Sequence, residues 1–241
     1  MKRGNNVQAS TTAHTEPTSV LLSVAEQLKI SLSTIARQAE LAQLTGTASF
    51  RDIAAIGVQA GAAMTLVESY LLGLQLLHEQ AELQLEPVSV SSILADTAHE
   101  LHRYAQAHEV QVELHIAGKY EPVMAHRRGL KAALLSLGYE LIGSQAPKQQ
   151  MVMAAHRASG GIVAGMYGSY EELSTETWRR SLQLCGRAGQ SLTAVSAGSS
   201  AGLFVANTIL QAMSAHLRVG RHRKQSGLVA TLQPSRQLVL V

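Results

Sequence analysis

Two apolar heptad repeats in succession constrain the fold of this chain most. Apolar residues recur at alternating spacings of four and three over residues 21–42, and again over residues 53–81. This spacing is typical of helices that pack side by side as in a coiled coil. Gly46 and the small polar residues around it predict a turn between the helices, and Pro87 predicts the end of the second one. The repeats therefore predict an antiparallel helical hairpin.

The apolar stripe on each helix is wider than one partner helix can cover, because further apolar residues flank the repeat. A hairpin of this kind buries its second face by pairing with a copy of itself, which gives a four-helix bundle. The alternative is an intramolecular bundle packed against the rest of the chain, and the length of the repeats favours the homodimer. The residues expected in the dimer interface are Leu21, Leu28, Leu32, Ile35, Ile56, Ala63, Val67, Tyr70, Leu74 and Leu77.

The pattern changes after the hairpin, where helical and alternating segments follow one another. Val110–Ile116 alternates with period two, as a half-buried strand does. Helices are predicted at residues 88–100, 129–142 and 202–213, and further strands at residues 151–155, 161–167, 217–220 and 228–232. Three helices on one face of a mixed sheet form an α+β layer arrangement. The predicted fold class is α+β, with a tail at residues 1–17, the hairpin at 18–86 and an α/β sandwich at 87–236.

Composition excludes several classes of function. The 241 residues are 46% hydrophobic and carry a formal charge of only +3, too little to favour nucleic acid as a partner by bulk electrostatics. The basic run Arg221–Lys224 is expected in a hairpin loop and is weak support for such a partner. Cys185 stands alone, and the ten histidines have no companions at ligand spacing, so no metal site is predicted. Residues 1–17 hold no signal-peptide segment, and no apolar run is expected to span a membrane, which favours a cytoplasmic protein.

The run Leu77–Val88 resembles the joint between the dimerisation hairpin and the ATP-binding domain of bacterial sensor histidine kinases. Asp96–Leu101, Val110–Ile116 and His126–Leu141 resemble the first helix, the first strand and the second helix of that domain. The resemblance covers about residues 20–235. It implies a dimeric helical bundle followed by an ATPase domain of the type shared with gyrase and Hsp90-type chaperones.

The residues that carry this family's chemistry are replaced at four positions. The phosphoacceptor His corresponds to Glu26, whose carboxylate has no ring nitrogen to hold a phosphoryl group. The Asn that binds Mg²⁺ corresponds to Glu140. The Asp that binds adenine corresponds to Met166, two residues before the remaining Gly168. The glycine pair of the ATP lid is reduced to Gly202.

These replacements favour a degenerate histidine kinase without a catalytic residue, which acts as a dimeric signalling scaffold or adaptor. The resemblance implies a response-regulator receiver domain as a partner of the helical bundle. No cofactor is expected. Two alternatives remain open: a divergent but active kinase or ATPase, for which ATP and Mg²⁺ would be cofactors, and a purely structural dimeric module. A measurement of nucleotide affinity distinguishes the active enzyme from the scaffold. Capture of a binding partner distinguishes the scaffold from the purely structural module.

Overall fold

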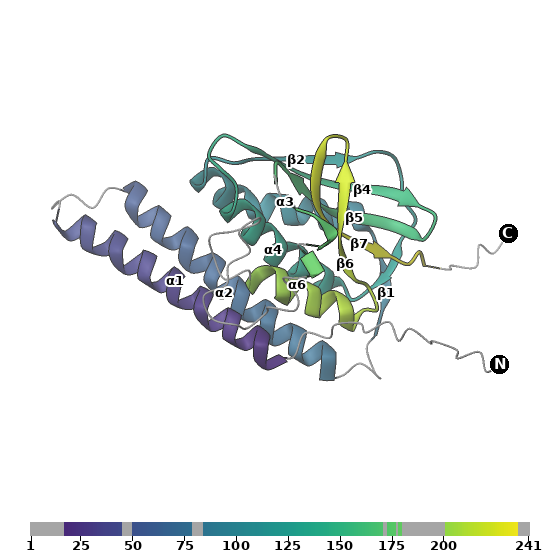
Figure 1. Ribbon diagram of the computed structural model, residues 1–241, viewed down its shortest axis with the longest axis horizontal. Helices are drawn as coiled ribbons and strands as arrows, with labels where there is room; N and C mark the ends of the chain where they lie inside the picture. Colours follow the sequence, from purple (N-terminus) through teal and green to yellow (C-terminus); the bar gives the residue numbers. More distant parts are fainter. Residues whose placement is uncertain are drawn as a thin grey trace, which may run out of the picture.

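The N-terminal part of the molecule is the predicted helical hairpin. The computed structural model describes residues 17–44, 50–78, 84–170, 173–176, 178–179 and 201–235. Helices α1 (Pro17–Leu44) and α2 (Phe50–His78) lie side by side along its length (Figure 1). Gln59 of α2 donates a hydrogen bond of 3.2 Å to Ser31 of α1, which links the two helices. The two predicted helices are confirmed, whereas the expected turn at Gly46 and residues 1–16 of the expected tail lie outside the described residues.

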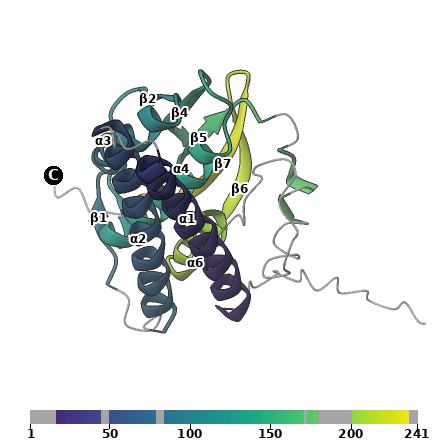
Figure 2. The same cartoon turned by 90° about the vertical axis from the view of Figure 1, so that its left-hand side faces the viewer.

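The second part is an α+β sandwich. Its five-stranded sheet has the order β2-β4-β5-β7-β6, with β2 and β4 parallel and the other neighbours antiparallel. The strands are β2 (Gln111–Ile116), β4 (Gln150–Ala158), β5 (Gly161–Gly168), β6 (Leu217–His222) and β7 (Gln225–Leu232). Helices α3 (Val90–Ala107), α4 (Arg127–Gly143) and α6 (Ala201–Ala212) cover one face of this sheet (Figures 1 and 2). The predicted arrangement of three helices on one face of a mixed sheet is confirmed.

A second, two-stranded sheet was not predicted. Strand β1 (Glu86–Val88) pairs antiparallel with β3 (Val123–Ala125). Strands of three residues are too short to show periodicity, and Pro87 was interpreted only as a helix end. A proline is compatible with a strand at a sheet edge, where its missing N–H costs no ladder hydrogen bond. The expected boundary between residues 86 and 87 therefore falls inside β1.

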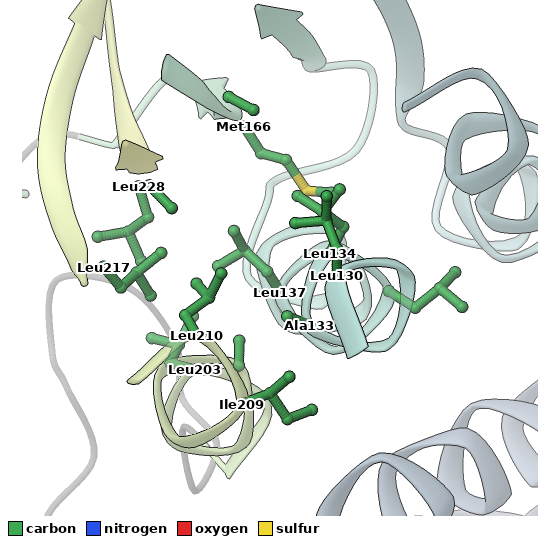
Figure 3. Packing of buried hydrophobic residues seen from close by; sticks show 14 of the residues in the cluster. Leu130, Ala133, Leu134, Leu137, Met166, Leu203, Ile209, Leu210, Leu217 and Leu228 are labelled. Atoms are coloured by element: carbon green, nitrogen blue, oxygen red, sulfur yellow. The ribbon is translucent and has the colours of Figure 1, made fainter. Parts of the chain in front are cut away.

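The main core lies between the sheet and its three helices. In Figure 3, Met166 points from β5 toward Leu130 and Leu134 of α4, and all three side chains are buried. On the other side of α4, its leucines meet α6, and the labelled residues there are Leu137, Leu203, Ile209 and Leu210. A smaller apolar cluster occupies the opposite face of the sheet and consists of Val152, Ala154, Val163, Tyr167 and Val229.

The hairpin packs on the sandwich both through residues of the predicted seam and through residues next to it. In α1, Val20 and Val24 are buried, whereas the seam residues Leu21 and Leu32 are 50% and 63% exposed. In α2, the predicted interface residue Tyr70 is buried within the single chain, at 7% exposure, so little of its side chain is left to contact a second copy. The apolar stripe was too wide to show which of its edges faces the chain's own sandwich.

Helix α2 also qualifies by length and composition as a candidate membrane span. The stretch Ile53–His78 has a mean hydropathy of 1.3, and 33% of an 18-residue window within it is buried inside the protein. The interrupted apolar runs of this segment did not indicate that the whole helix would reach such a length. A helix that buries one side against its own domain passes the same test, and Leu66, Tyr70 and Leu76 of α2 are buried in this way.

Candidate functional site

A cavity of about 330 Å³ lies where the hairpin meets the sandwich. The hairpin contributes hydroxyl and amide side chains to its wall, and the sandwich contributes aromatic rings, a carboxylate and the start of α6. The polar and aromatic lining residues are Gln27, Ser31, Thr34, Gln59, Tyr104, His108, Ser136, Tyr139, Glu140 and Gly202. Two of the predicted nucleotide-site residues, Glu140 and Gly202, therefore meet in one cavity.

The carboxylate of Glu140 is bound to the N-terminus of α6. Its Oε2 atom accepts a hydrogen bond of 3.2 Å from the backbone N–H of Gly202. The first N–H groups of a helix have no partner within the helix, and the helix dipole makes them a site for anions. Glu140 thus supplies an anion from the protein itself to this helix N-terminus.

Gly202 allows this close approach because α6 packs tightly on α4. A Cβ atom built on Gly202 would lie 2.5 Å from the carbonyl oxygen of Ser136 and 3.0 Å from Cβ of Glu140. The first is a backbone atom and the second is a Cβ, whose position the backbone of α4 fixes, so neither can move aside independently of α4. Any larger residue must therefore push the start of α6 away from α4.

The electrostatics of the cavity are unfavourable for a polyphosphate. Among the described residues that line it, none is Lys or Arg. Burial lowers the pKa of His108, which keeps that ring neutral near pH 7. Burial, and next the charge of Glu140, raise the pKa of Tyr104, so its hydroxyl stays protonated. Glu140 is consequently the charged group that an incoming ligand would meet first.

The expected adenine position is part of the core. Met166 is fully buried, with 0% exposure, and its thioether cannot accept a hydrogen bond as a carboxylate does. Gly168, at the end of β5, faces Gln145 and Tyr170, and a Cβ built on it would lie 3.0 Å from the Tyr170 ring. Gln145 Nε2 donates a hydrogen bond of 3.0 Å to the Tyr170 hydroxyl, which closes this end of the strand.

The expected phosphoacceptor position lies outside the cavity. Glu26 is exposed on α1, as predicted, and borders a separate groove of about 360 Å³ with Lys29 and Arg37. Ile30 and Thr34 line both the groove and the cavity, so the two adjoin across α1. The structure thus brings Glu140 and Gly202 together, leaves Glu26 on the far side of α1 and keeps Met166 in the core.

The contacts that close the site were not predicted. Glu140 and Gly202 are 62 positions apart in the sequence, and Gln145 and Tyr170 are 25 apart. Neither periodicity nor a local motif can predict contacts between residues so far apart in the sequence. The small residues around Gly202 were the one available signal, since they allow helices to approach closely.

The close packing at Gly202 gives a first prediction. Gly202→Ala should lower the free energy of unfolding by about 1–3 kcal/mol, the usual cost of overpacking. The matched control is Gly57→Ala in α2, where a Cβ meets nothing within 4 Å. That substitution should stabilise the protein by about 1 kcal/mol, because Gly is a poor helix former. Urea denaturation of both variants measures the difference, and equal effects of the two would contradict the tight packing of α6 on α4.

The basic run at residues 221–224 lies largely where it was predicted. Arg223 and Lys224 form the turn between β6 and β7, and Arg223 has a positive φ of 53°. Arg221 and His222 belong to the end of β6, which is longer than predicted.

Comparisons with known proteins show which solved structures share this architecture. No family model matches the sequence, and no curated protein matches it either. Among solved structures, histidine kinase AdeS of Acinetobacter baumannii superposes with a TM-score of 0.55 at 14% identity, over 87% of this chain and 98% of that one. ShkA, solved at full length in complex with AMPPNP, gives 0.52 at 13% identity, over 91% of this chain and 44% of that one. The catalytic domain of histidine kinase ThkA gives 0.51 at 8% identity, over 63% of this chain and 97% of that one. The chain therefore has a sensor-histidine-kinase-like fold.

Proposed function

We propose that this chain is a histidine-kinase-like pseudoenzyme, a cytoplasmic homodimer that serves signalling as a scaffold or adaptor. The observation that carries the proposal is the bond between Glu140 and the N-terminus of α6. A nucleotide phosphate at that place would have to displace a carboxylate that is already hydrogen bonded there. Two negative charges about 4 Å apart repel by roughly 1 kcal/mol in water and roughly 4 kcal/mol near a protein surface.

Two further positions support the absence of phosphoryl transfer. Met166 offers no acceptor for the adenine amino group and is buried among leucines. Glu26 faces solvent at the position of the phosphoacceptor, and a carboxylate lacks the imidazole nitrogen that forms a phosphoramidate. The replacement of the adenine contact and the replacement of the nucleophile are thus two independent reasons to expect no phosphoryl transfer.

The surface of the hairpin supports a binding role. Among the described residues, eight large apolar side chains are strongly exposed, and seven of them lie on α1 or α2: Leu21, Ile30, Leu32, Leu41, Ile53, Met64 and Leu71. Leu21 and Leu32 are eleven residues apart in the sequence, which puts both on one side of α1, and exposed apolar side chains that share a face mark an interaction surface. We assign the stripe to a second copy of the chain, because Leu21 and Leu32 are seam positions of the predicted coiled coil. The remaining surface of the bundle is available for a receiver domain.

The direct test is incubation with ATP labelled at the γ-phosphoryl group and Mg²⁺. We expect no acid-labile label on the protein and no transfer to a receiver domain, because the nucleophile is absent. An active histidine kinase serves as the positive control in the same buffer. Label that appears on this chain and disappears in His78→Ala, an exposed histidine at the end of α2, would establish the active-kinase alternative instead.

A further inference from the structure

Two histidines from distant parts of the sequence meet on the face of the sheet opposite the helices. Nδ1 of His115, on β2, lies 3.3 Å from Nε2 of His222, at the end of β6. Three strands separate β2 from β6 in the sheet, so the sheet is curled enough to bring its two ends together. In Figure 1, the hairpin of β6 and β7 accordingly crosses in front of the other strands.

The distance between the two nitrogens suits two ligands of one metal ion. Zinc–imidazole bonds are about 2.0–2.1 Å long, so two nitrogens 3.3 Å apart subtend an angle of about 107° at a shared ion. That angle is close to the tetrahedral value that zinc sites adopt. An N–H···N hydrogen bond between the rings explains the same distance without an ion, and a binding titration separates the two.

A carboxylate orients one of the two rings. Nε2 of His115 lies 3.1 Å from Oε2 of Glu113, two residues earlier on the same strand. If Nε2–H donates to this carboxylate, Nδ1 of His115 is left with its lone pair directed at His222. A carboxylate that holds the outer nitrogen of a histidine is the usual support for a metal ligand, since it fixes the tautomer and makes the inner nitrogen more basic.

Near the two histidines, buried polar atoms also lack hydrogen-bond partners among the described residues. Glu113 and His115 pair with Val152 and Ala154 of the smaller apolar cluster, so both side chains lie on its face. On the same face, Tyr167 packs its ring 5.2 Å from the His222 ring, and its buried hydroxyl has no hydrogen-bond partner among the described residues. The buried Nδ1 of His156 also lacks one there. Water molecules bound to an ion at the pair could satisfy such groups.

We propose that His115 and His222 bind one divalent transition-metal ion of the zinc class, with water completing its coordination. The described residues contain no group of three or more His, Cys, Asp or Glu arranged for a metal ion, so the protein supplies two ligands. Such a site would tie the tip of the β6–β7 hairpin to the edge strand β2. The ion would therefore lock the curl of the sheet.

The test is a Zn²⁺ titration of untagged, chelator-treated full-length protein, followed by calorimetry and by melting temperature. The titration uses the Cys185→Ser variant as its background, because the single thiol of the chain would otherwise compete for zinc. We expect one ion per chain and a higher melting temperature. His115→Ala and His222→Ala should each weaken binding by about a hundredfold, because the second ligand no longer acts beside the first. Glu113→Gln should weaken it by about tenfold to a hundredfold.

His99→Ala and His102→Ala are the matched controls, since both rings are exposed on α3, and neither should change the affinity. Melting curves without metal establish that every variant is folded. The absorption spectrum of the Co²⁺ form gives an independent readout of tetrahedral coordination in the parent protein. Binding that does not saturate, or that is unchanged in both His115→Ala and His222→Ala, would overturn the proposal. So would loss of binding only in the α3 variants.

Discussion

Glu140→Asn should increase the affinity of this chain for ATP with Mg²⁺ by about fivefold to several hundredfold, the effect of removing between about 1 and 4 kcal/mol of charge repulsion. The substitution frees the N–H of Gly202, which Glu140 now binds at 3.2 Å. It also restores the residue type that binds Mg²⁺ in the family that the sequence resembles. We expect the parent protein to show almost no rise in melting temperature at millimolar ATP and Mg²⁺, and the variant to show a clear one, since a ligand of the native state stabilises it.

Three further variants separate the loss of charge repulsion from the gain of new hydrogen bonds. Glu140→Gln removes the charge and keeps the side-chain volume, so it should recover the part of the ATP affinity that charge repulsion costs. It should not recover the part that depends on the shorter side chain of Asn. Met166→Asp combined with Glu140→Asn should add a hydrogen bond to a charged group, worth about 1.5–3 kcal/mol, or about tenfold to a hundredfold. Without ATP, Met166→Asp should destabilise the fold in the single and in the double variant, because it buries an unpaired carboxylate at a fully buried position. A low-micromolar dissociation constant for the parent chain would contradict the pseudoenzyme proposal.

Much of the fold could be predicted from the sequence because its signals are local. The heptad repeats specified α1 and α2, and alternation specified β2 at residues 111–116 almost to its ends. Helix α3 continues beyond the predicted residue 100, since Leu101, Tyr104 and Ala105 extend its buried face. Strands β1 and β3 were missed because three residues hold no period that can be recognised.

The site was only partly predictable for a related reason. The residue types at Glu26, Glu140 and Met166 can be read one by one, and they indicate which groups are absent. How Glu140 is used instead depends on α4 and α6 approaching each other through Gly202, a tertiary contact. The same limit applies to His115 and His222, which are 107 positions apart and have no companions at ligand spacing in the sequence. The spacing of the two histidines in the sequence does not show that they are in contact, because the curvature of the sheet creates this contact.

Leu32→Asp should convert a homodimer into a monomer at micromolar protein concentration. Leu32 is 63% exposed in the single chain, so the substitution costs the isolated fold little. In a dimer built on the predicted seam the side chain would be buried, and an unpaired charge there costs several kcal/mol. A two-fold symmetric dimer contains the change twice, which doubles the penalty. A loss of about 3 kcal/mol already weakens association by more than a hundredfold.

The choice of Leu32 separates association from folding. Leu74, another predicted seam residue, packs against the core of its own chain, so a charge there would damage both. Leu114→Asp is the matched control, because Leu114 is the one strongly exposed leucine among the described residues that lies outside the hairpin, at 40% exposure. Light scattering after size exclusion gives the mass of each variant, and melting curves verify that each is folded. A monomeric parent at micromolar concentration would contradict the dimer. Sedimentation of the parent, but not of Leu32→Asp, with lipid vesicles would assign the apolar stripe of α1 and α2 to a membrane surface instead.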